Sequence, residues 1–277
     1  MSALVWLGFG LIIGSFTNVL ILREGAGALR GRSVCPSCKE TLGVRDLIPV
    51  LSWIFLRARC RSCSAPISIQ YPIVEILVGL GFFVIGGLLV PIYLKLIAGA
   101  IIVLWVAIAV YDFYHMLMPN VWVWSWNILA LLFTWVWLFE VGASFAEYLV
   151  AFGWGIAVAL PLFALHFFSR GAWMGFGDVK FALGMGFLLG PYGFLALLYA
   201  FVLGAIVGLA LVFFSSPYAA RLRAAVTPTR RSVEPPVKVT MKSEVPFGPF
   251  LIIGTVLIWF ALFYAHMPLL TFLGLLR

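Results

Sequence analysis

The sequence contains three aspartates, and two of them lie at the ends of long apolar runs. Asp112 follows the run 94–111, and Asp178 comes just before the run 179–190. A charge is costly to place beside such segments, so residues of this kind usually serve chemistry. Two neighbouring carboxyl groups push their proton affinities apart, which suits one as an acid and the other as a base. The pattern predicts a pair that activates water against an amide, with Asp46 interpreted as structural.

The residues around the two aspartates predict helix ends. Asp112 closes one helix, and Pro119 prevents easy continuation into the next because it lacks an amide donor and clashes with the preceding turn. Gly175 and Gly177 allow a close backbone approach immediately before Asp178. Asp178 would begin a helix, where the macrodipole favours a carboxylate, whereas Asp112 would end one. We therefore expect Asp178 to act as the base and Asp112 as the acid.

All four cysteines fall in one polar segment as two C-x-x-C pairs. Cys35 and Cys38 form the first pair, Cys60 and Cys63 form the second, and 21 residues separate the pairs. Each pair presents two thiolates to one metal ion, and two pairs complete a closed tetrahedral site. We predict structural zinc, with reduced or redox-active thiols as the alternative, since a reducing cytosol disfavours disulfides. The apolar stretch 47–56 is predicted to lie against the membrane surface, against the helices, or in the core of this module.

The composition excludes a soluble globular protein. Of 277 residues, 64% are hydrophobic and 10% are charged, and the mean hydropathy is +1.13. The apolar runs are continuous and do not alternate as barrel strands do. Because a spanning helix needs about 20 predominantly apolar residues, we predict an all-α polytopic membrane protein with about eight transmembrane helices. Their predicted ranges are 3–22, 72–90, 94–111, 121–140, 147–168, 179–190, 192–214 and 248–273.

The basic residues predict the orientation in the membrane. All but two of the 18 Lys and Arg residues, Lys95 and Arg277, fall in the segments 23–70, 169–180 and 215–246. The positive-inside rule puts these segments in the cytoplasm and the N-terminus outside. Both aspartates would then face the cytoplasm. This topology explains the net charge of +8, so anionic membrane lipids are predicted partners and nucleic acid is not.

The same patterns divide the chain into three parts. Residues 1–22 are predicted as the first transmembrane helix, and 23–70 as a small cytoplasmic zinc-ribbon-like module. Residues 71–277 are predicted as the transmembrane domain that carries the aspartates. Within that domain, the proline-rich and basic segment 215–246 is predicted to be a cytoplasmic connector.

Seven motifs follow one another along the chain. They are Gly14-Ser15-Phe16-Thr17-Asn18-Val19, the two C-x-x-C pairs, Ile48-Pro49-Val50-Leu51-Ser52-Trp53, Tyr71-Pro72-Ile73-Val74-Glu75, Asp112 with Pro119-Asn120, Gly175-Phe176-Gly177-Asp178-Val179-Lys180, and Pro246-Phe247-Gly248-Pro249-Phe250. With these motifs most of the chain resembles the type IV prepilin peptidases. These are intramembrane aspartyl proteases of the GxGD type, which serve bacterial pilus and type II secretion systems as leader peptidases and N-methyltransferases.

The resemblance implies a function. Asp112 and Asp178 would be the catalytic pair that removes the N-terminal leader of a prepilin or pseudopilin, at the cytoplasmic face of the bacterial inner membrane. The new N-terminal residue would be methylated from S-adenosylmethionine. Gly175 and Gly177 would support the aspartates as part of the motif. Lys180 would hold a carboxylate or the substrate, or would only follow the positive-inside rule.

Methyl transfer rests on the resemblance alone. The sequence has no glycine-rich fingerprint for S-adenosylmethionine, so the residues that bind this methyl donor are unknown and are expected near the cysteine module. Ala58 stands where the family usually has glycine, and this departure bears on methyl transfer. Glu75 opens the second span and is predicted to pair with a cation or to line the cleft.

Two other classes of function fit parts of the pattern. A transporter or channel would use Asp112 and Asp178 for proton or cation coupling, with the zinc module docking a partner. An assembly scaffold would need neither aspartate. The glycines of the predicted helix 179–190 make it slim, which we interpret as room for a substrate helix; they are Gly184, Gly186 and Gly190.

Overall fold

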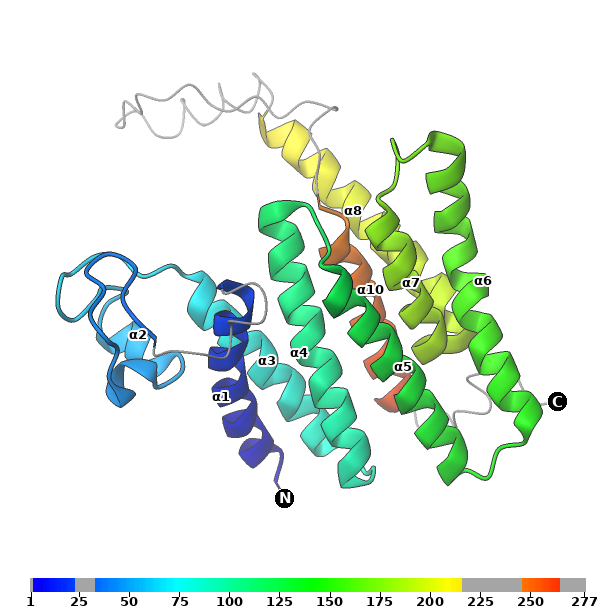
Figure 1. Ribbon diagram of the computed structural model, residues 1–277, viewed down its shortest axis with the longest axis horizontal. Helices are drawn as coiled ribbons and strands as arrows, with labels where there is room; N and C mark the ends of the chain where they lie inside the picture. Colours follow the sequence, from blue (N-terminus) through cyan, green and yellow to red (C-terminus); the bar gives the residue numbers. More distant parts are fainter. Residues whose placement is uncertain (1, 23–32, 216–245, 265–277) are drawn as a thin grey trace.

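The described part of the chain is helical. The computed structural model describes residues 2–22, 33–215 and 246–264, and within these ranges the only strand-like features are two isolated β-bridges. Figure 1 shows the helices side by side, with the cysteine module at one end of the row. The elements in chain order are α1 (Ala3–Leu22), η1 (Val44–Leu47), α2 (Leu51–Phe55), α3 (Gln70–Gly87), α4 (Ile92–His115), α5 (Asn120–Glu140), α6 (Phe145–Ser169), α7 (Phe176–Leu189), η2 (Gly190–Tyr192), α8 (Gly193–Ser215) and α10 (Gly248–Tyr264).

A helix occurs at each predicted position, but the count of eight spans is not confirmed. Six stretches of the described chain are long and apolar enough to cross a membrane, and one of these runs through α7, η2 and α8 together. Helix α10 is apolar but shorter, at 17 described residues. The protein is therefore a multi-pass membrane protein. The predicted connector 215–246 and the end of the predicted span 248–273 lie almost wholly outside the described residues.

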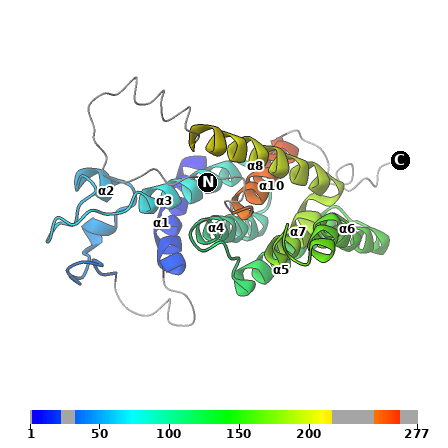
Figure 2. The same cartoon turned by 90° about the horizontal axis from the view of Figure 1, so that it is seen from above.

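Close backbone packing joins α1 to α3. A Cβ added to Gly14 would lie 2.7 Å from the Cα of Glu75, so only glycine permits this approach. Asn18, one turn further along α1, donates from its side-chain amide to the carbonyl oxygen of Tyr71 at 3.1 Å. The resulting helix pair carries the cysteine module, which Figures 1 and 2 both place beside it.

Helix α7 is held between α5 and α6, which corrects the prediction of free space beside it. A Cβ on Gly184 would lie 2.4 Å from the Trp126 indole of α5. A Cβ on Gly186 would lie 2.2 Å from the Trp154 carbonyl oxygen of α6. The glycines thus let α5 and α6 pack closely against α7. Gly190, with a φ of 54°, caps the C-terminal end of α7.

Polar side chains of α5 fix the position of α7. Trp126 donates to the carbonyl oxygen of Phe181 at 3.1 Å, and Thr134 donates to that of Phe187 at 2.8 Å. Asn127 donates to the carbonyl oxygen of Lys180 at 3.0 Å. In a surrounding without water such bonds have few competitors, so they define both the rotation and the depth of α7.

An aromatic cluster joins α4, α5 and α10. The Trp105 ring of α4 packs edge-on against Trp126 and Trp259, with centroids 5.1 and 5.2 Å apart. Trp259 belongs to α10, which also contacts α7 and α8. Figure 2 shows α10 lying between α4 and α8. The core therefore ties the last described helix to those that carry the two aspartates.

Candidate active site and metal centre

Asp112 lies in the last turn of α4, which runs on to His115. The sequence predicted that Asp112 would close the helix, but the chain leaves it only at Met116, whose φ of 52° is left-handed. The connecting turn is correspondingly shorter than predicted, because α4 continues to His115 while Pro119 caps α5. The Asp112 side chain is 5% exposed, and its Oδ2 accepts a hydrogen bond of 3.0 Å from the backbone amide of Gly248.

Asp178 lies in the first turn of α7, as predicted. Gly175 is the N-terminal cap, and the backbone amides of Gly175 and Asp178 itself face the carboxylate. The loop before it is held by His166, whose Nδ1 lies 2.9 Å from the carbonyl oxygen of Met174. The carboxyl group of Asp178 is close enough to that of Asp112 for the two charges to interact. The two aspartates thus come together from different helices.

Three segments far apart in sequence meet at this place. Met118, in the turn after Asp112, packs against both Gly177 and Gly248. A Cβ on Gly248 would lie 2.6 Å from Oδ2 of Asp112 and 2.5 Å from Cε of Met118, so this contact requires glycine. Both aspartates therefore face backbone amide donors. This reduces the difference in proton affinity that their positions at opposite helix ends alone would predict. The assignment of acid and base stays a prediction.

The predicted supporting residues lie in two different places. The Lys180 ammonium donates to Oδ1 of Asn120 at the start of α5 and lies 5.3 Å from the centroid of the Phe176 ring. Lys180 thus links α7, which carries Asp178, to the start of α5. Glu75 is instead 7% exposed at the joint of α3 with the module, where its Oε2 accepts a hydrogen bond of 2.7 Å from the Val50 amide. It also interacts with the hydroxyl of Ser15 in α1.

The four cysteines form one compact cluster. Their sulfur atoms all lie within 4.8 Å of one another, and those of Cys35 and Cys63 are 3.8 Å apart. Zinc binds thiolate sulfur at about 2.3 Å, which places the sulfurs of a tetrahedral site about 3.8 Å apart. The cluster therefore fits a closed zinc site, with Cys35, Cys38, Cys60 and Cys63 as the ligands.

The two cysteine pairs lie in equivalent backbone loops. In the first, the Cys35 amide donates to the Glu40 carbonyl oxygen, the Lys39 amide to that of Cys35, and Val34 bridges Thr41. The second repeats these contacts, 25 residues later in the chain. The Cys60 amide donates to the Ala65 carbonyl oxygen, the Ser64 amide to that of Cys60, and Arg59 bridges Pro66. Each loop orients its own two sulfurs.

Backbone amides also tune the first thiol. The amides of Cys38 and Ser37 face the Cys35 sulfur and lower the pKa of that thiol to about 6. A thiol with this pKa is mostly thiolate at neutral pH, the form that binds metal. Ala58, immediately before the second loop, has a φ of 58°, a left-handed conformation in which glycine is at ease and alanine is strained.

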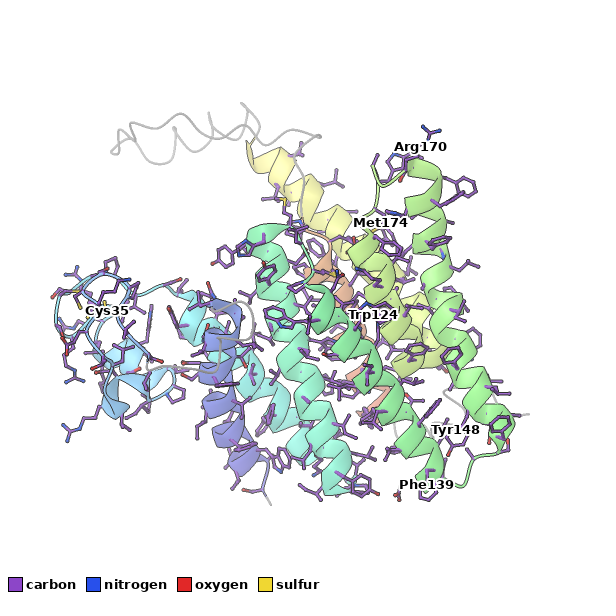
Figure 3. The ribbon with its side chains drawn as sticks, in the orientation of Figure 1. Cys35, Trp124, Phe139, Tyr148, Arg170 and Met174 are labelled. Atoms are coloured by element: carbon purple, nitrogen blue, oxygen red, sulfur yellow. The ribbon has the colours of Figure 1, made fainter. Side chains whose placement is uncertain are left out.

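The metal cluster and the aspartates occupy different flanks of the molecule. Figure 3 shows Cys35 in the module beside α1, whereas Met174, four residues before Asp178, lies beyond α4 and α5. The cysteine cluster thus lies apart from the two aspartates in this geometry. Four sulfur ligands also leave no open position for a substrate.

Two family profiles match the chain. Residues 9–87 match the bacterial peptidase A24 N-terminal domain, and residues 99–209 match the type IV leader peptidase family. A prepilin leader peptidase/N-methyltransferase of Klebsiella pneumoniae is 32% identical over 195 residues, which is 65% of this chain and 82% of the relative. The chain belongs to the type IV leader peptidase family. This confirms the family inferred from the seven motifs, and it does not favour the transporter alternative.

Other relatives of the family match different lengths. The prepilin leader peptidase/N-methyltransferase of Aeromonas hydrophila is 29% identical over 290 residues, covering 92% of this chain and 88% of the relative. The protein of the same name from Myxococcus xanthus is 53% identical over 76 residues, but this is only 27% of this chain and 23% of the relative. A type 4 prepilin-like proteins leader peptide-processing enzyme of Escherichia coli is matched over 49% of its length. The search of solved structures found no significant match to this chain.

Sequence reasoning missed two contacts in the aspartate site. The Gly248 amide that binds Asp112 belongs to a motif that the sequence analysis recognised without giving it a role. Met118 was not considered, although it separates Gly177 from Gly248. The only sequence signal was the pair of prolines that flank Phe247 and Gly248, which implies a fixed backbone at that point.

Proposed function

We propose that this protein removes the leader peptide of type IV prepilins or type II secretion pseudopilins, with Asp112 and Asp178 as the catalytic pair. The observation that carries the proposal is the meeting of two aspartates from α4 and α7, with the Gly248 amide on one of them. The names of the relatives support a prepilin-type substrate. The positive-inside pattern supports cleavage at the cytoplasmic face of the bacterial inner membrane.

The proposed chemistry uses one water molecule. The ionised Asp178 takes a proton from water, and the water oxygen attacks the carbonyl carbon of the scissile amide. Asp112 gives its proton to the carbonyl oxygen. Asp178 then gives the proton that it took from water to the amide nitrogen, and Asp112 takes back a proton from the tetrahedral intermediate as the carbon–nitrogen bond breaks. This releases the mature N-terminus and restores both aspartates. The Gly248 amide holds one oxygen of Asp112 throughout, so the other oxygen carries the proton.

Methylation of the new N-terminus is the second part of the proposal, and it rests on the names of the relatives. S-adenosylmethionine would supply the methyl group. A pocket of the described module is lined by Arg45 and Arg61 but by no carboxylate, so it does not match the cationic sulfonium and ammonium groups of this donor. We derive no methyl-transfer step from the structure for that reason.

Mass spectrometry of a purified prepilin incubated with the detergent-solubilised protein tests the peptidase. The wild type should release the leader, and Asp112→Asn and Asp178→Asn should each abolish release with unchanged zinc content. Glu140→Gln, an acid at the other end of α5, is the matched control and should cleave normally. Substantial leader removal by either aspartate variant would contradict the catalytic pair.

The same assay tests methylation when S-adenosylmethionine is added. The mature product should then gain the mass of one methyl group at its N-terminus. Leader removal without this gain, in the presence of the donor, would restrict the function to the peptidase.

A further inference from the structure

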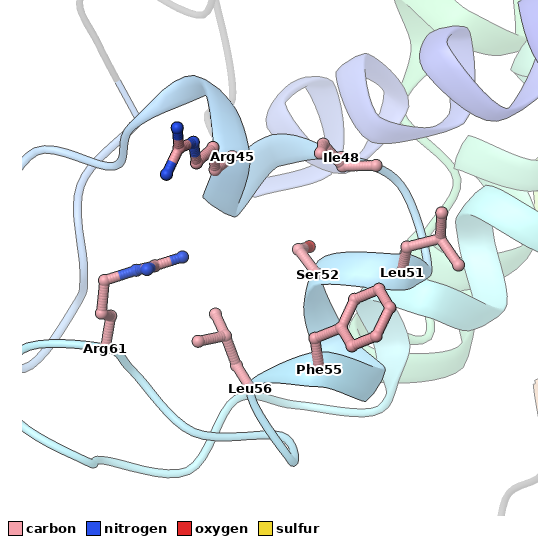
Figure 4. Close-up of a pocket in the computed structure, with 7 residues that line it drawn as sticks. All are labelled: Arg45, Ile48, Leu51, Ser52, Phe55, Leu56 and Arg61. Atoms are coloured by element: carbon pink, nitrogen blue, oxygen red, sulfur yellow. The ribbon is translucent and has the colours of Figure 1, made fainter.

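A pocket of about 330 Å³ lies in the cysteine module, and one of its lining residues, Arg61, comes from the second cysteine loop. Figure 4 shows its lining residues, with two arginines on one side and apolar side chains on the other. The lining consists of Arg45, Ile48, Leu51, Ser52, Phe55, Leu56 and Arg61. A pocket with a cationic end and an apolar end is suited to an amphiphilic anion.

The arginines at the cationic end keep hydrogen-bond donors available for a ligand. Arg61 directs Nε and a terminal nitrogen to Oδ1 of Asp46, at 2.8 and 2.7 Å, yet its side chain is 58% exposed. Arg45 makes no ion pair with any residue that the structure describes. The planar guanidinium group binds phosphate through two parallel hydrogen bonds, so two arginines facing one pocket favour a phosphate ligand.

The apolar end is exposed to an unusual degree. Phe55 is 80% exposed, and Leu51 and Ile48 are 51% and 44% exposed. Val44 of η1 and Ile54 of α2 are 83% and 55% exposed as well. Soluble proteins rarely leave such a contiguous apolar surface in water, because each side chain loses the gain of burial. An apolar environment would therefore stabilise this surface.

The position of the module supplies that environment. In Figure 1 helix α2 is drawn level with α1, not beyond its end, and Figure 2 also places the module beside α1 and α3. Helix α1 is a candidate membrane span of 20 residues. The hydrogen bond from the Val50 amide to Glu75 ties the start of α2 to the same helix pair. The apolar surface of the module is thus held beside helices that are candidate membrane spans.

We propose that this pocket binds an anionic phospholipid and so anchors the cysteine module to the membrane surface. The lipid phosphate binds Arg45 and Arg61, and its glycerol and first acyl carbons lie along Leu51 and Phe55. A free phosphate would use the arginines and leave the apolar wall uncovered. The proposal is independent of the peptidase activity, since none of these residues belongs to the segments that carry Asp112 and Asp178.

Native mass spectrometry of the zinc-loaded, full-length protein in detergent tests the site. The probes are dioctanoyl-phosphatidylglycerol and dioctanoyl-phosphatidylcholine, with inorganic phosphate and S-adenosylmethionine as competitors. The wild type should bind phosphatidylglycerol at a saturable site, about tenfold more tightly than phosphatidylcholine. Neither competitor should displace the lipid.

Variants assign the binding to the pocket. Arg45→Gln should weaken phosphatidylglycerol binding about tenfold, and it breaks no ion pair within the described chain. Arg59→Gln removes the same charge from an exposed position outside the pocket and should bind as the wild type does. Phe55→Ser should weaken binding of the lipid through its apolar part.

Three results would overturn the proposal. Equal losses of lipid binding in Arg45→Gln and Arg59→Gln would reduce the effect to general charge attraction. Displacement of the lipid by inorganic phosphate at equal concentration would identify a free-anion site. Displacement by S-adenosylmethionine would identify the pocket with the methyl donor.

Discussion

The cysteine module and the helical bundle are stabilised in opposite ways. The module consists of short loops, each closed by hydrogen bonds between residues fewer than ten positions apart, and its four sulfurs converge on one point. The bundle consists of long helices whose specific contacts join residues more than fifty positions apart, such as Trp126 with Phe181. A module with so few buried residues needs a metal, whereas the bundle relies on shape. Damage to one part should therefore leave the other folded.

Removal of the zinc site is the change with the largest expected effect. Cys35→Ser with Cys38→Ser should release the metal and unfold the module, because binding energies of structural zinc are on the order of 10 kcal/mol. Zinc content by elemental analysis and limited proteolysis of residues 33–69 measure the result. The helices of the bundle should keep their thermal transition. Full zinc content in the double variant would exclude the four-thiolate site.

Crowding of α7 tests the bundle alone. Gly186→Ala should destabilise it by about 1–3 kcal/mol, because the new Cβ meets the Trp154 carbonyl oxygen at 2.2 Å and must push α6 away. Gly153→Ala, on α6 with open space around it, is the matched control and should be neutral or stabilising. Thermal unfolding in detergent compares the two, and zinc content should not change in either. Equal transitions for both variants would show that α7 is not tightly held.

Acidification should affect the module before the bundle. The pKa of the Cys35 thiol is lowered to about 6 by backbone amides, whereas that of the Cys38 thiol is raised to about 12 by burial and the neighbouring thiols. Protons therefore compete with zinc at Cys38 already at neutral pH, and they compete at Cys35 as well once the pH falls through about 6. Zinc affinity should fall by up to about tenfold per proton and pH unit, and most steeply below pH 6. Competition with a chelator between pH 7 and pH 5 measures it. An affinity that stays constant over this range would contradict the assigned thiolate.

The smallest expected effect concerns the strained residue at the second cysteine loop. Ala58→Gly should stabilise the zinc-loaded module by about 1 kcal/mol, because alanine carries a cost in the left-handed conformation that glycine avoids. Ala65→Gly is the control in the same loop, where φ is not positive, and it should destabilise the module slightly. Protease resistance of the module ranks the two variants. A loss of stability in Ala58→Gly would show that the strain is not released.

Local patterns predicted the parts of the fold that depend on neighbouring residues. The apolar runs predicted α1 and the helices α3 to α8 to within four residues, and the cysteine spacing predicted the sulfur cluster, because both follow from residues close in sequence. The short helix α2 was not predicted, and the predicted end of the last span lies outside the described residues. The extension of α4 to His115 was missed because Pro119 limits only the residue before it, so the helix was free to continue past Asp112. The Gly248 amide on Asp112 was missed because 136 positions separate the two residues. The prolines beside Gly248 indicate a fixed backbone there, but they do not indicate which residue it contacts.

The repeated cysteine loops have a consequence for the order of events during synthesis. Both loops close through nearby residues, and the last ligand, Cys63, comes before Gln70, where α3 begins. A chain that grows from its N-terminus has therefore received its whole metal site before the second membrane helix is made. Zinc capture at that stage would give α1 a finished partner while the ribosome is still adding the helices that carry Asp112 and Asp178.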